Sequence, residues 1–397
     1  MAFDKAYIPY GGYWSSPFCR WQGGLSEQNS VELVARTAKR FLGEREIGAD
    51  NFDGIVVGVT VPQHRSFYGG PWAAVLAGLP GVTGPMVGQA CATGARALYE
   101  ASSELETGMR SGVLALTCDR TSNGPHVYYP SPKGVGGRVK TEEWVWDNFN
   151  ADPNTKLAML ATAENVAKKY GITREEQDET MLIRNEQYQA ALADDRAFQK
   201  KYMYALEIPK GRKKTITIDA DEGIFPTTKE GLAGLRTVMP EGTVTFGTQT
   251  YPADGNAGMI VTTKERAEAL SKDGGPVTQV ISFGDARVEK AHMPMAVVPA
   301  AKAALERAGI SASDCAAIKT HNPFAVNDLV MSKELGIPIE GFNHYGSPIV
   351  YGHPQGPTGM RVMVEMIEEI AAKGGGYGLF SGCAAGDTAM AVVVKVG

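Results

Sequence analysis

Residues 30–58 read SVELVARTAKRFLGEREIGADNFDGIVVG, and residues 297–321 read VVPAAKAALERAGISASDCAAIKTH. Each stretch has apolar residues at helical spacing, then a polar connection and a short apolar run. Residues 47–55 align with residues 310–318 without a gap. The chain is therefore predicted to contain two similar halves, whose alternating helices and buried strands favour mostly parallel sheets covered by helices.

The stretch between the two halves has a different character. It opens with the polar, Pro- and Gly-rich sequence SNGPHVYYPSPKGVGGRVK and contains one long helical pattern at about residues 162–192. Insertions of this kind commonly carry substrate recognition while a rigid core carries the chemistry. We therefore predict a first half at residues 1–120, completed by about 245–270, an inserted loop domain at 121–244, and a second half at 271–397.

The composition excludes some classes of partner. The 397 residues carry a formal net charge of −5 at pH 7, and 43% of them are hydrophobic, enough for a sizeable core. Without a basic field, DNA or RNA is not expected as a partner. The first residues lack the basic and apolar regions of a targeting sequence, and no apolar run reaches the ~20 residues that span a bilayer. The sequence thus predicts a cytoplasmic protein that binds neither nucleic acid nor membrane.

The cysteines do not indicate a disulfide scaffold or a zinc site. There are five, an odd number, and none is paired at a spacing such as C-x-x-C. The glycine clusters also lack the G-x-G-x-x-G pattern of a dinucleotide site. In a reducing compartment each cysteine is either a small buried hydrophobic residue or a reactive thiolate, and its neighbours decide between the two.

Cys91 lies in the sequence VGQACATGARALYEASSEL. Here a buried apolar run turns through small residues into an amphipathic helix that begins near Ala92. The positive end of the helix dipole and the free amides would lower the pKa of the thiol and favour the thiolate that a covalent catalyst needs. A buried structural cysteine at a strand-to-helix turn fits the same pattern.

Three further segments combine small residues with groups suited to catalysis. In YGHPQGPTGMRVMVEMIEEI, His353 lies in a turn before a helix, as a base aimed at a thiol or as a polar surface residue. In YGLFSGCAAGDTAMAVVVKV, Cys383 precedes small residues whose amides can hold an oxyanion, although a tight hairpin with a buried cysteine fits equally well. In IKTHNPFAVNDL, a predicted strand ends in His321 and Asn322.

Together these segments resemble the thiolase family, and the resemblance covers nearly the whole chain. Six motifs follow one another in the order of the family: PFCRWQGGLSEQ (17–28), CATGARAL (91–98), TAENVAKKYGITREEQDE (162–179), GTVTFG (242–247), GHPQGPTG (352–359) and CAAGDTA (383–389). The resemblance implies the thiolase fold, an α/β fold with a duplicated, layered α-β-α-β-α core and an inserted loop domain. It also implies an acyltransferase that cleaves a 3-oxoacyl-CoA or runs the reverse Claisen condensation, with coenzyme A as substrate or product, no bound cofactor and no metal.

The resemblance assigns roles to the four motif residues. Cys91 accepts an acyl group after giving its proton to His353, and Cys383 exchanges a proton with the α-carbon of an acyl-CoA. In the family one oxyanion site consists of the GHP histidine and a water, and His321 matches the residue that holds this water. The block HNPF is closest to the His-Asp-Cys-Phe block of sterol-carrier-like and archaeal thiolases, and its departure at Asn322 and Pro323 makes Asn322 a further candidate for holding the water.

Other site residues are also carried over from the family. The second oxyanion site would consist of the backbone amides of Cys91 and Ala385, and Ala385, where the family has Gly, requires ordinary dihedral angles. The sequence KGRKKTITIDADE is similar to a family segment that contacts the CoA nucleotide, and Arg212 is the matching arginine. Thr250 matches a position near the pantetheine arm, and Phe324 is expected to wall the same tunnel.

Two other functions remain open. A decarboxylating ketoacyl synthase also has a duplicated core and a nucleophilic cysteine, but the GHP turn and the second cysteine favour a thiolase. A non-catalytic thiolase-fold subunit that binds lipids or a partner protein has no need of Cys91, His353 and Cys383 together. The family is usually a homodimer or a dimer of dimers.

The motifs do not define the acyl group. The aromatic residues Tyr128, Tyr129, Trp144 and Trp146 of the inserted segment, with the HNPF block, suggest a bulky or aromatic substrate, or else belong to the core. Some sterol-carrier-like thiolases work beside a small zinc-bearing OB-fold partner subunit, including those that cleave benzoylsuccinyl-CoA. A benzoylsuccinyl-CoA thiolase subunit is the most specific interpretation of this sequence.

Overall fold

The two similar stretches of sequence form the same substructure in the two halves of the protein. The computed structural model describes residues 2–211 and 214–397. In each half a helix leads through a short 3₁₀ turn into a strand of the central sheet. These elements are α1 (Ser30–Glu44), η1 (Ala49–Asn51) and β4 (Gly54–Gly58) in the first half, and α9 (Val297–Ala308), η7 (Ala312–Asp314) and β13 (Cys315–His321) in the second.

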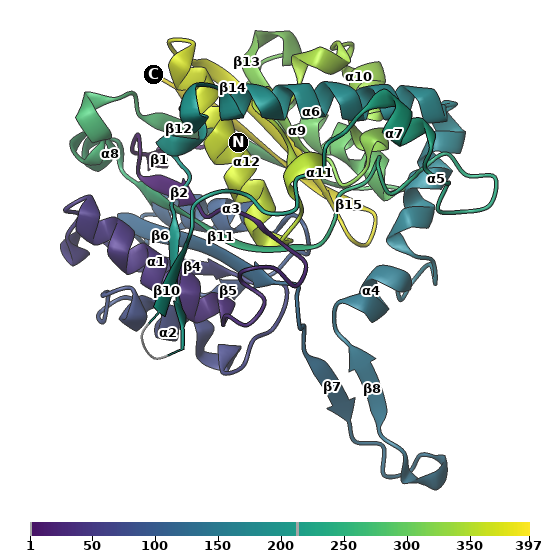
Figure 1. The fold of residues 1–397 in the computed structure, drawn as a ribbon. Helices are drawn as coiled ribbons and strands as arrows, with labels where there is room; N and C mark the ends of the chain where they lie inside the picture. Colours follow the sequence, from purple (N-terminus) through teal and green to yellow (C-terminus); the bar gives the residue numbers. More distant parts are fainter. Residues whose placement is uncertain (1, 212–213) are drawn as a thin grey trace.

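One mixed sheet runs through both halves (Figure 1). Its other strands are β1 (Tyr7–Ile8), β2 (Tyr13–Ser15), β3 (Cys19–Arg20), β5 (Met86–Val87), β6 (Gly112–Arg120), β11 (Ala253–Thr262), β12 (Thr278–Arg287), β14 (Gly376–Ala384) and β15 (Thr388–Val396). They follow the order β13-β14-β15-β12-β1-β11-β6-β4-β5, and β2 and β3 also pair with β11. Strand β1 is antiparallel to β11 on one side and to β12 on the other, so it joins the two half-sheets.

The pairing of the strands is duplicated as well. Strand β4 is parallel to β6, which is antiparallel to β11, and β13 is parallel to β14, which is antiparallel to β15. The duplicated, layered α/β core is therefore confirmed, but the prediction of mostly parallel sheets is wrong. Residues 385–387 turn β14 straight back into β15, because an antiparallel partner needs no helical crossover.

Five layers of helices and strands build the body. Helices α3 (Thr93–Glu106) and α12 (Gly356–Ala372) lie against each other in the middle layer, and α12 contacts β6 and β11 of the first half and β13 and β14 of the second. Helix α1 covers the outer face of the first half-sheet, and α9 covers that of the second. Residues that precede α3 and α12 therefore meet between the two halves.

Helix α12 is buried on all sides and still carries charged residues. Arg361 makes two hydrogen bonds to Asp221, at 2.6 and 2.8 Å, and one to Glu365 at 3.0 Å. The guanidinium carbon lies 4.6 Å from the ring centroid of Phe18 and 3.7 Å from that of Tyr351. A buried charge costs free energy unless it is paired. This network therefore fixes α12 to the inserted segment, which contributes Asp221.

Two helices, α5 (Met159–Tyr170) and α6 (Arg174–Arg196), occupy the region of the inserted segment where the sequence predicted one long helix at about residues 162–192. The break lies at Gly171, whose φ of 61° ends the first helix, and Thr173 and Glu176 form a capping box that starts the second.

Within the described ranges no helix is long and apolar enough to cross a membrane. Besides a hairpin, the inserted segment contains the helices and strands α4 (Trp146–Asn150), α5 (Met159–Tyr170), α6 (Arg174–Arg196), β9 (Leu206–Lys210), β10 (Lys214–Ile218) and α7 (Lys229–Ala233). The bounds of the three domains stay a prediction.

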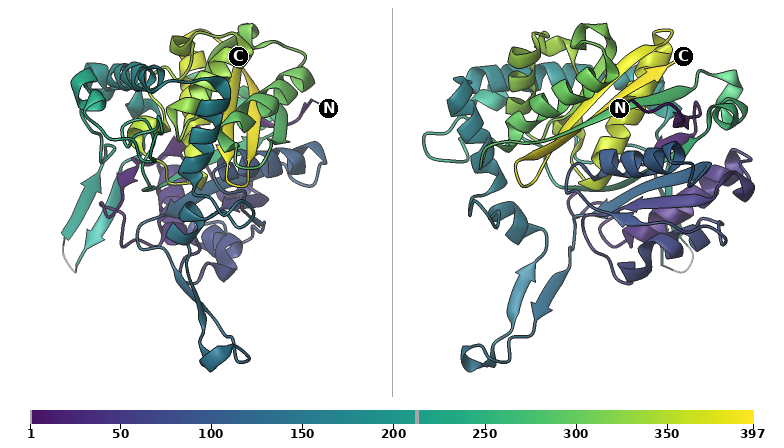
Figure 2. Two further views of the ribbon diagram at one scale, coloured as in Figure 1. Left: turned by 90° about the vertical axis from the view of Figure 1, so that its right-hand side faces the viewer. Right: turned by 180° about the vertical axis from the view of Figure 1, so that it is seen from behind.

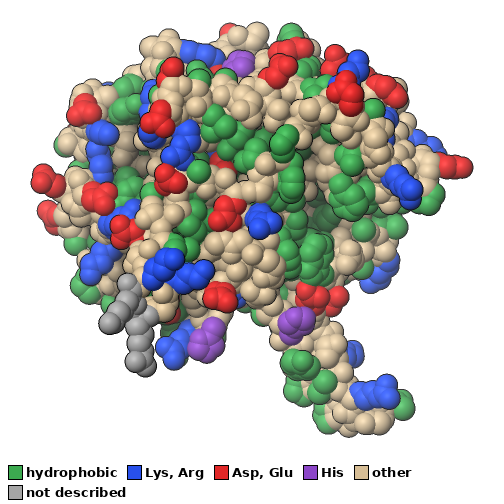
Figure 3. All heavy atoms as spheres, in the orientation of Figure 1, with side chains coloured by type: hydrophobic (Ala, Val, Ile, Leu, Met, Phe, Trp, Pro, Cys, Tyr) green, Lys and Arg blue, Asp and Glu red, His purple; other side chains and the backbone are tan. Residues whose placement is uncertain are grey.

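A hairpin arm projects from the body (Figures 1 and 2). It consists of β7 (His126–Tyr129) and β8 (Lys140–Glu143). Its hydrophobic side chains are largely exposed, with Tyr128 at 66% and Val135 at 99% of full exposure, and hydrophobic atoms are visible along the arm in Figure 3. At its base Trp146 packs against Trp21, with ring centroids 5.2 Å apart.

Candidate active site

Four segments that are far apart in the sequence meet between the two half-sheets. Cys91 precedes α3, His353 precedes α12, His321 ends β13, and Cys383 lies near the end of β14. The sulfur of Cys91 and ring nitrogens of His321 and His353 lie within 4.8 Å of one another. Cys383 lies close enough to Cys91 that a negative charge on the Cys91 sulfur raises the pKa of the Cys383 thiol. The first half thus supplies one cysteine, and the second half supplies two histidines and another cysteine.

The turn before α3 holds Cys91 in place. Ala90 has a φ of 45°, a left-handed conformation that costs free energy in a non-glycine residue and is concentrated at functional sites. The hydroxyl of Thr93 accepts a hydrogen bond from the Gln89 N–H at 2.8 Å and donates one to the Ala90 carbonyl at 2.7 Å. Thr93 therefore stabilises the strained turn that presents the Cys91 side chain.

The thiol of Cys91 is protonated in the resting site. The surrounding protein raises its pKa to about 12, while the backbone amides of Ala385 and of Cys91 itself lower the pKa by less. The prediction that the helix N-terminus lowers the pKa of this thiol is therefore wrong, because the loss of hydration outweighs the dipole and the amides. Cys91 needs a base to become a nucleophile.

Gln355 is a neighbour of Cys91 that sequence reasoning missed. The thiol of Cys91 donates a hydrogen bond to Oε1 of Gln355 at 3.2 Å. Gln355 directly precedes α12 and has a φ of 59°, which is unusual for a non-glycine residue. Its place in the GHPQG turn was a signal that it lies near the site, but the sequence does not give the direction of its side chain.

His353 is arranged to accept a proton. Its Nδ1 is hydrogen-bonded to Oγ1 of Thr358 at 2.7 Å, and its Nε2 is buried without a hydrogen-bond partner in the described part of the chain. Burial, followed by the neighbouring His321, holds the pKa of His353 well below its usual range, so the ring is neutral. When Nδ1–H donates to Thr358, the lone pair lies on Nε2.

His321 presents a second neutral ring to the same site. Its ring centroid lies 4.1 Å from that of His353, and the two planes are inclined by 31°. Burial lowers the pKa of His321 to about 3. Neither ring nitrogen has a hydrogen-bond partner among residues 2–211 and 214–397. Because buried polar groups are normally paired, these nitrogens are available to a substrate oxygen or a water.

Cys383 lies beside this group. Burial, followed by the neighbouring Cys91, raises the pKa of the Cys383 thiol above its ordinary value, and Asn327 donates a hydrogen bond to its sulfur at 3.2 Å. In the turn that follows, Gly386 takes a φ of 83°, whereas Ala385 is not among the non-glycine residues with positive φ. The condition for an alanine at position 385 is therefore met.

The side chain of Asn322 is hydrogen-bonded to other parts of the protein and does not face the site together with His321. Its Nδ2 donates hydrogen bonds to Asp328 at 2.7 Å and to Ser347 at 3.0 Å, and its Oδ1 accepts one from the Ile349 N–H at 3.3 Å. All polar atoms of the Asn322 side chain are thus used within the protein. This geometry does not provide the direct contribution to holding a water that was expected of Asn322.

The structure describes two of the three residues assigned to CoA binding. Arg212 lies outside the described residues. Thr250 bonds to the protein itself, through its N–H to the Pro323 carbonyl at 2.8 Å and through its hydroxyl to the Pro348 carbonyl at 2.6 Å. Phe324 is only 5% exposed and packs in the core of the second half. The CoA contacts of all three residues stay a prediction.

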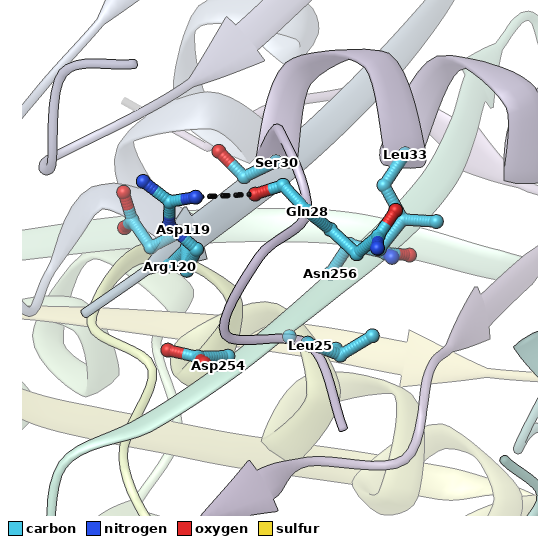
Figure 4. Close-up of a pocket in the computed structure, with 9 residues that line it drawn as sticks. Leu25, Gln28, Ser30, Leu33, Asp119, Arg120, Asp254 and Asn256 are labelled. Carbon is cyan, nitrogen blue, oxygen red and sulfur yellow. Dashed lines mark hydrogen bonds between the residues drawn. The ribbon is translucent and has the colours of Figure 1, made fainter. Parts of the chain in front are cut away.

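Asp119 contacts the start of α12 and also lines a small pocket (Figure 4). Its carboxylate accepts hydrogen bonds from the N–H and hydroxyl of Thr60 and from the N–H groups of Val61 and Gly356, each at 2.8 Å. The bond from Gly356 ties the start of α12 to the first half. This pocket has a volume of about 10 Å³. Because this volume holds about one water molecule, the pocket is not a site for a thioester.

A cysteine and two histidines at this spacing also match three ligands of a tetrahedral zinc site. We do not assign them as metal ligands, since an ion there would occupy the lone pairs that a nucleophile and its base need. The expected absence of a metal stays a prediction.

Known proteins share both the sequence and the fold. The family models described as Thiolase, N-terminal domain and Thiolase, C-terminal domain match residues 14–265 and 275–396. Beta-ketothiolase BktB of Cupriavidus necator is 31% identical over 384 residues, which cover 94% of this chain and 95% of that protein. Human mitochondrial 3-ketoacyl-CoA thiolase is 27% identical over 387 residues, 96% of each chain. The crystal structure of the Bacillus anthracis acetyl-CoA acetyltransferase superposes with a TM-score of 0.91 at 26% identity, covering 100% of this chain and 99% of that one.

The chain belongs to the thiolase family. Its chemistry is CoA-dependent acyl transfer or condensation, and the protein is an acyltransferase. The family, the fold and the enzyme class that the six motifs implied are thereby confirmed. The roles of single residues, the nearer branch of the family and the substrate are not tested by these similarities.

Proposed function

We propose that the protein is a thiolase that works by a ping-pong mechanism through an acyl-Cys91 intermediate. The main support is the convergence of Cys91, His321 and His353 within 4.8 Å. A protonated thiol beside a neutral imidazole fits nucleophilic catalysis with base assistance. A second thiol at Cys383 fits proton transfer to and from carbon.

In the cleavage direction, the Cys91 sulfur attacks the 3-oxo carbon of a 3-oxoacyl-CoA while its proton passes to Nε2 of His353. The bond between C2 and C3 then breaks, its electron pair goes to C2, and Cys383 delivers a proton there. A shorter acyl-CoA leaves, and the remaining acyl group stays on Cys91. The proton on His353 passes to the Cys383 thiolate, so that both groups return to their neutral forms.

In the second half-reaction, the thiol of CoA attacks the acyl group on Cys91. His353 takes the proton of the CoA thiol and returns it to the departing Cys91 sulfur, which restores the resting enzyme. Run in reverse, the same steps are a Claisen condensation. Both half-reactions use groups already present in the site.

Two sets of donors stabilise the oxygens that become negatively charged. The amides of Cys91 and Ala385 lie beside the Cys91 sulfur and serve the oxygen of the acyl group that it carries. His321, through a water, and His353 serve the oxygen of the thioester enolate. A preorganised donor of this kind is worth about 3–4 kcal/mol.

The acyl group is the least defined part of the proposal. Tyr128 and Tyr129, two of the aromatic residues that suggested a bulky substrate, lie on the projecting arm. Trp144 donates a hydrogen bond to the Thr60 carbonyl at 2.9 Å, and Trp146 packs at the base of the arm. A bulky acyl group such as that of benzoylsuccinyl-CoA is therefore kept as one member of a test panel.

We also propose a homodimer that forms along β5, the last strand of the sheet. Met86 of β5 is 40% exposed, and in the segment 66–76 that precedes β5 in the chain, Phe67, Tyr68 and Val75 are 89%, 67% and 58% exposed. A strand edge beside exposed apolar side chains invites association. Met86→Glu should give a monomer in sedimentation velocity. Val135→Glu on the arm should leave the dimer intact, and loss of a tetramer with this variant would indicate a dimer of dimers.

Intact-protein mass spectrometry with a panel of acyl-CoA and 3-oxoacyl-CoA thioesters, benzoylsuccinyl-CoA included, tests the proposed mechanism. A 3-oxoacyl-CoA should leave an acyl adduct that peptide mapping places on Cys91, and the mass of the adduct identifies the acyl group. Cys91→Ser should abolish the adduct. Cys315→Ser is the matched control, since Cys315 is also partly exposed but lies outside the site.

Two results would overturn the proposal. Release of CO₂ from a malonyl thioester, with no cleavage of 3-oxoacyl-CoA, would indicate a decarboxylating ketoacyl synthase. No adduct with any thioester, alone or with a candidate OB-fold partner subunit, would indicate a non-catalytic subunit.

A further inference from the structure

Asn327 is a buried polar residue that the mechanism above does not use. It lies in the first turn of α10 (Ala325–Leu335) and has no exposed surface. Its Nδ2 lies 3.2 Å from the sulfur of Cys383. Within the described residues, no other side chain makes a hydrogen bond to that sulfur.

The orientation of the Asn327 amide is fixed by its two other partners. The backbone N–H of Phe324 can only donate, so the Oδ1 of Asn327 must face it, at 3.2 Å. The carbonyl of Pro294 can only accept, so Nδ2 must face it, also at 3.2 Å. Since an amide nitrogen carries two N–H groups, the second is directed at the Cys383 sulfur.

This contact opposes the cost of placing a negative charge on Cys383. Burial and the nearby Cys91 favour the neutral thiol, whereas the hydrogen bond from Asn327 favours the thiolate. The bond from Phe324 to Asn327 also links the Cys383 sulfur to the segment that carries His321. One amide thus places the proton-transfer group relative to the oxyanion site.

We propose that Asn327 is a positioning residue for proton transfer at carbon: it holds the Cys383 sulfur and donates the hydrogen bond that the thiolate needs. The inference rests on the proposed role of Cys383. In cleavage, the S–H bond breaks, the proton goes to the α-carbon, and the electron pair stays on the sulfur, where it meets the Asn327 N–H. In condensation, the same hydrogen bond stabilises the thiolate that removes the α-proton.

Two exchange reactions of acetyl-CoA separate this step from acyl transfer. Exchange of label between CoA and acetyl-CoA needs Cys91 and His353, whereas exchange of the α-hydrogens for deuterium in D₂O also needs Cys383. Loss of one preorganised donor to an oxyanion costs about 10²–10³ in rate, and sulfur is a weaker acceptor. Asn327→Ala should therefore slow α-exchange about 10- to 100-fold and leave label exchange within about threefold.

The pH profile must agree with this role. The rate of α-exchange rises with pH as the Cys383 thiolate forms, and loss of a donor to the thiolate raises the pKa of this thiol. The rising limb of α-exchange in Asn327→Ala should therefore move to higher pH by about one to two units, which corresponds to the 10- to 100-fold loss. The unequal effect on α-exchange and label exchange distinguishes this role from a purely structural one.

Two further variants serve as controls. Asn327→Asp keeps an acceptor for the Phe324 N–H but puts a carboxylate oxygen against the sulfur, so α-exchange at neutral pH should be at least as slow as in Asn327→Ala. It also carries the test if Asn327→Ala fails to fold. Asn165→Ala loses a hydrogen bond from Nδ2 to the Ala291 carbonyl, at 2.9 Å, away from both cysteines, and should leave both exchange rates unchanged.

The outcomes separate this inference from the proposed function. Equal loss of both exchange reactions in the Asn327 variants, or α-exchange at the wild-type rate with an unmoved pH limb, would show a structural role only and overturn the inference. If the wild-type enzyme exchanges label and α-exchange still proceeds in Cys383→Ala, the proposed role of Cys383 itself is overturned.

Discussion

Replacing Thr358 by valine tests how His353 is prepared to act as a base. Valine has nearly the shape of threonine but lacks the hydroxyl that lies 2.7 Å from Nδ1 of His353. Its loss leaves Nδ1 buried without a partner, or moves the ring proton to Nε2, the atom that must accept the proton of Cys91. A buried polar group that loses its partner costs about 1–3 kcal/mol. This cost corresponds to a roughly 5- to 150-fold slower acylation of Cys91.

The assay is single-turnover acylation of Cys91 by a 3-oxoacyl-CoA, followed by rapid quenching and mass spectrometry. Thr358→Ser retains a hydroxyl and should keep most of the rate. Thr162→Val is the matched control, because it loses a hydroxyl bond to the Met159 carbonyl, at 2.6 Å, in helix α5. If Thr358→Val were acylated at the wild-type rate with its fold intact by circular dichroism, the hydrogen bond would not prepare His353 and the reasoning would fail.

Four other outcomes are expected. Arg361→Met leaves two buried carboxylates without their cation and should lower the free energy of unfolding in urea by about 3–5 kcal/mol. Lys302→Met, which removes the cation of an exposed pair with an N–O distance of 3.0 Å, should lower it by less than about 1 kcal/mol. Similar losses in the two variants would contradict the role given to the Arg361 network. Cys383→Ala should stop cleavage and condensation but leave label exchange between CoA and acetyl-CoA, and Cys91→Ser should stop all three; normal thiolysis by Cys383→Ala would exclude the role of that thiol. Alkylation of Cys91 by iodoacetamide should rise about tenfold per pH unit from pH 7 to 10, because its pKa is raised to about 12, and a plateau near neutral pH would instead indicate a thiolate. The pKa of His321 is lowered to about 3, so between about pH 6.5 and pH 3 the unfolded chain binds a proton at His321 that the folded protein does not. As the pH falls through this range, the free energy of unfolding should decrease by up to about 1.4 kcal/mol per pH unit. His321→Ala should make this decrease smaller in urea titrations.

The duplicated architecture and the four site segments were predictable because their signals are local. A helix, a turn and a buried strand leave the same pattern in residues 30–58 and 297–321. The break between α5 and α6 was also readable in principle, since Gly171, Thr173 and Glu176 carry the usual termination and capping signals. A continuous apolar periodicity concealed it.

Other properties of the molecule depend on long-range placement. The strand directions follow from pairings such as Tyr7 with Thr262, and apolar runs look the same in parallel and antiparallel sheets. The raised pKa of Cys91 depends on how much protein surrounds the thiol, which its place before a helix does not reveal. The contacts of Gln355 and Asn327 with the two cysteines depend on side-chain directions in the folded protein.

The short strand β1 sets a condition on the order in which the chain can fold during synthesis. Its first partner is Thr262, opposite Tyr7, and its second is β12, where Thr278 lies opposite Ile8. At roughly 5–20 residues per second, a ribosome takes about 13–50 s to make the residues between Tyr7 and Thr262. During that time neither partner strand of β1 has been completed. A ribosome that stalls between Thr262 and Thr278 leaves the first half-sheet with an open edge, and with a nucleophile whose base has not yet been made.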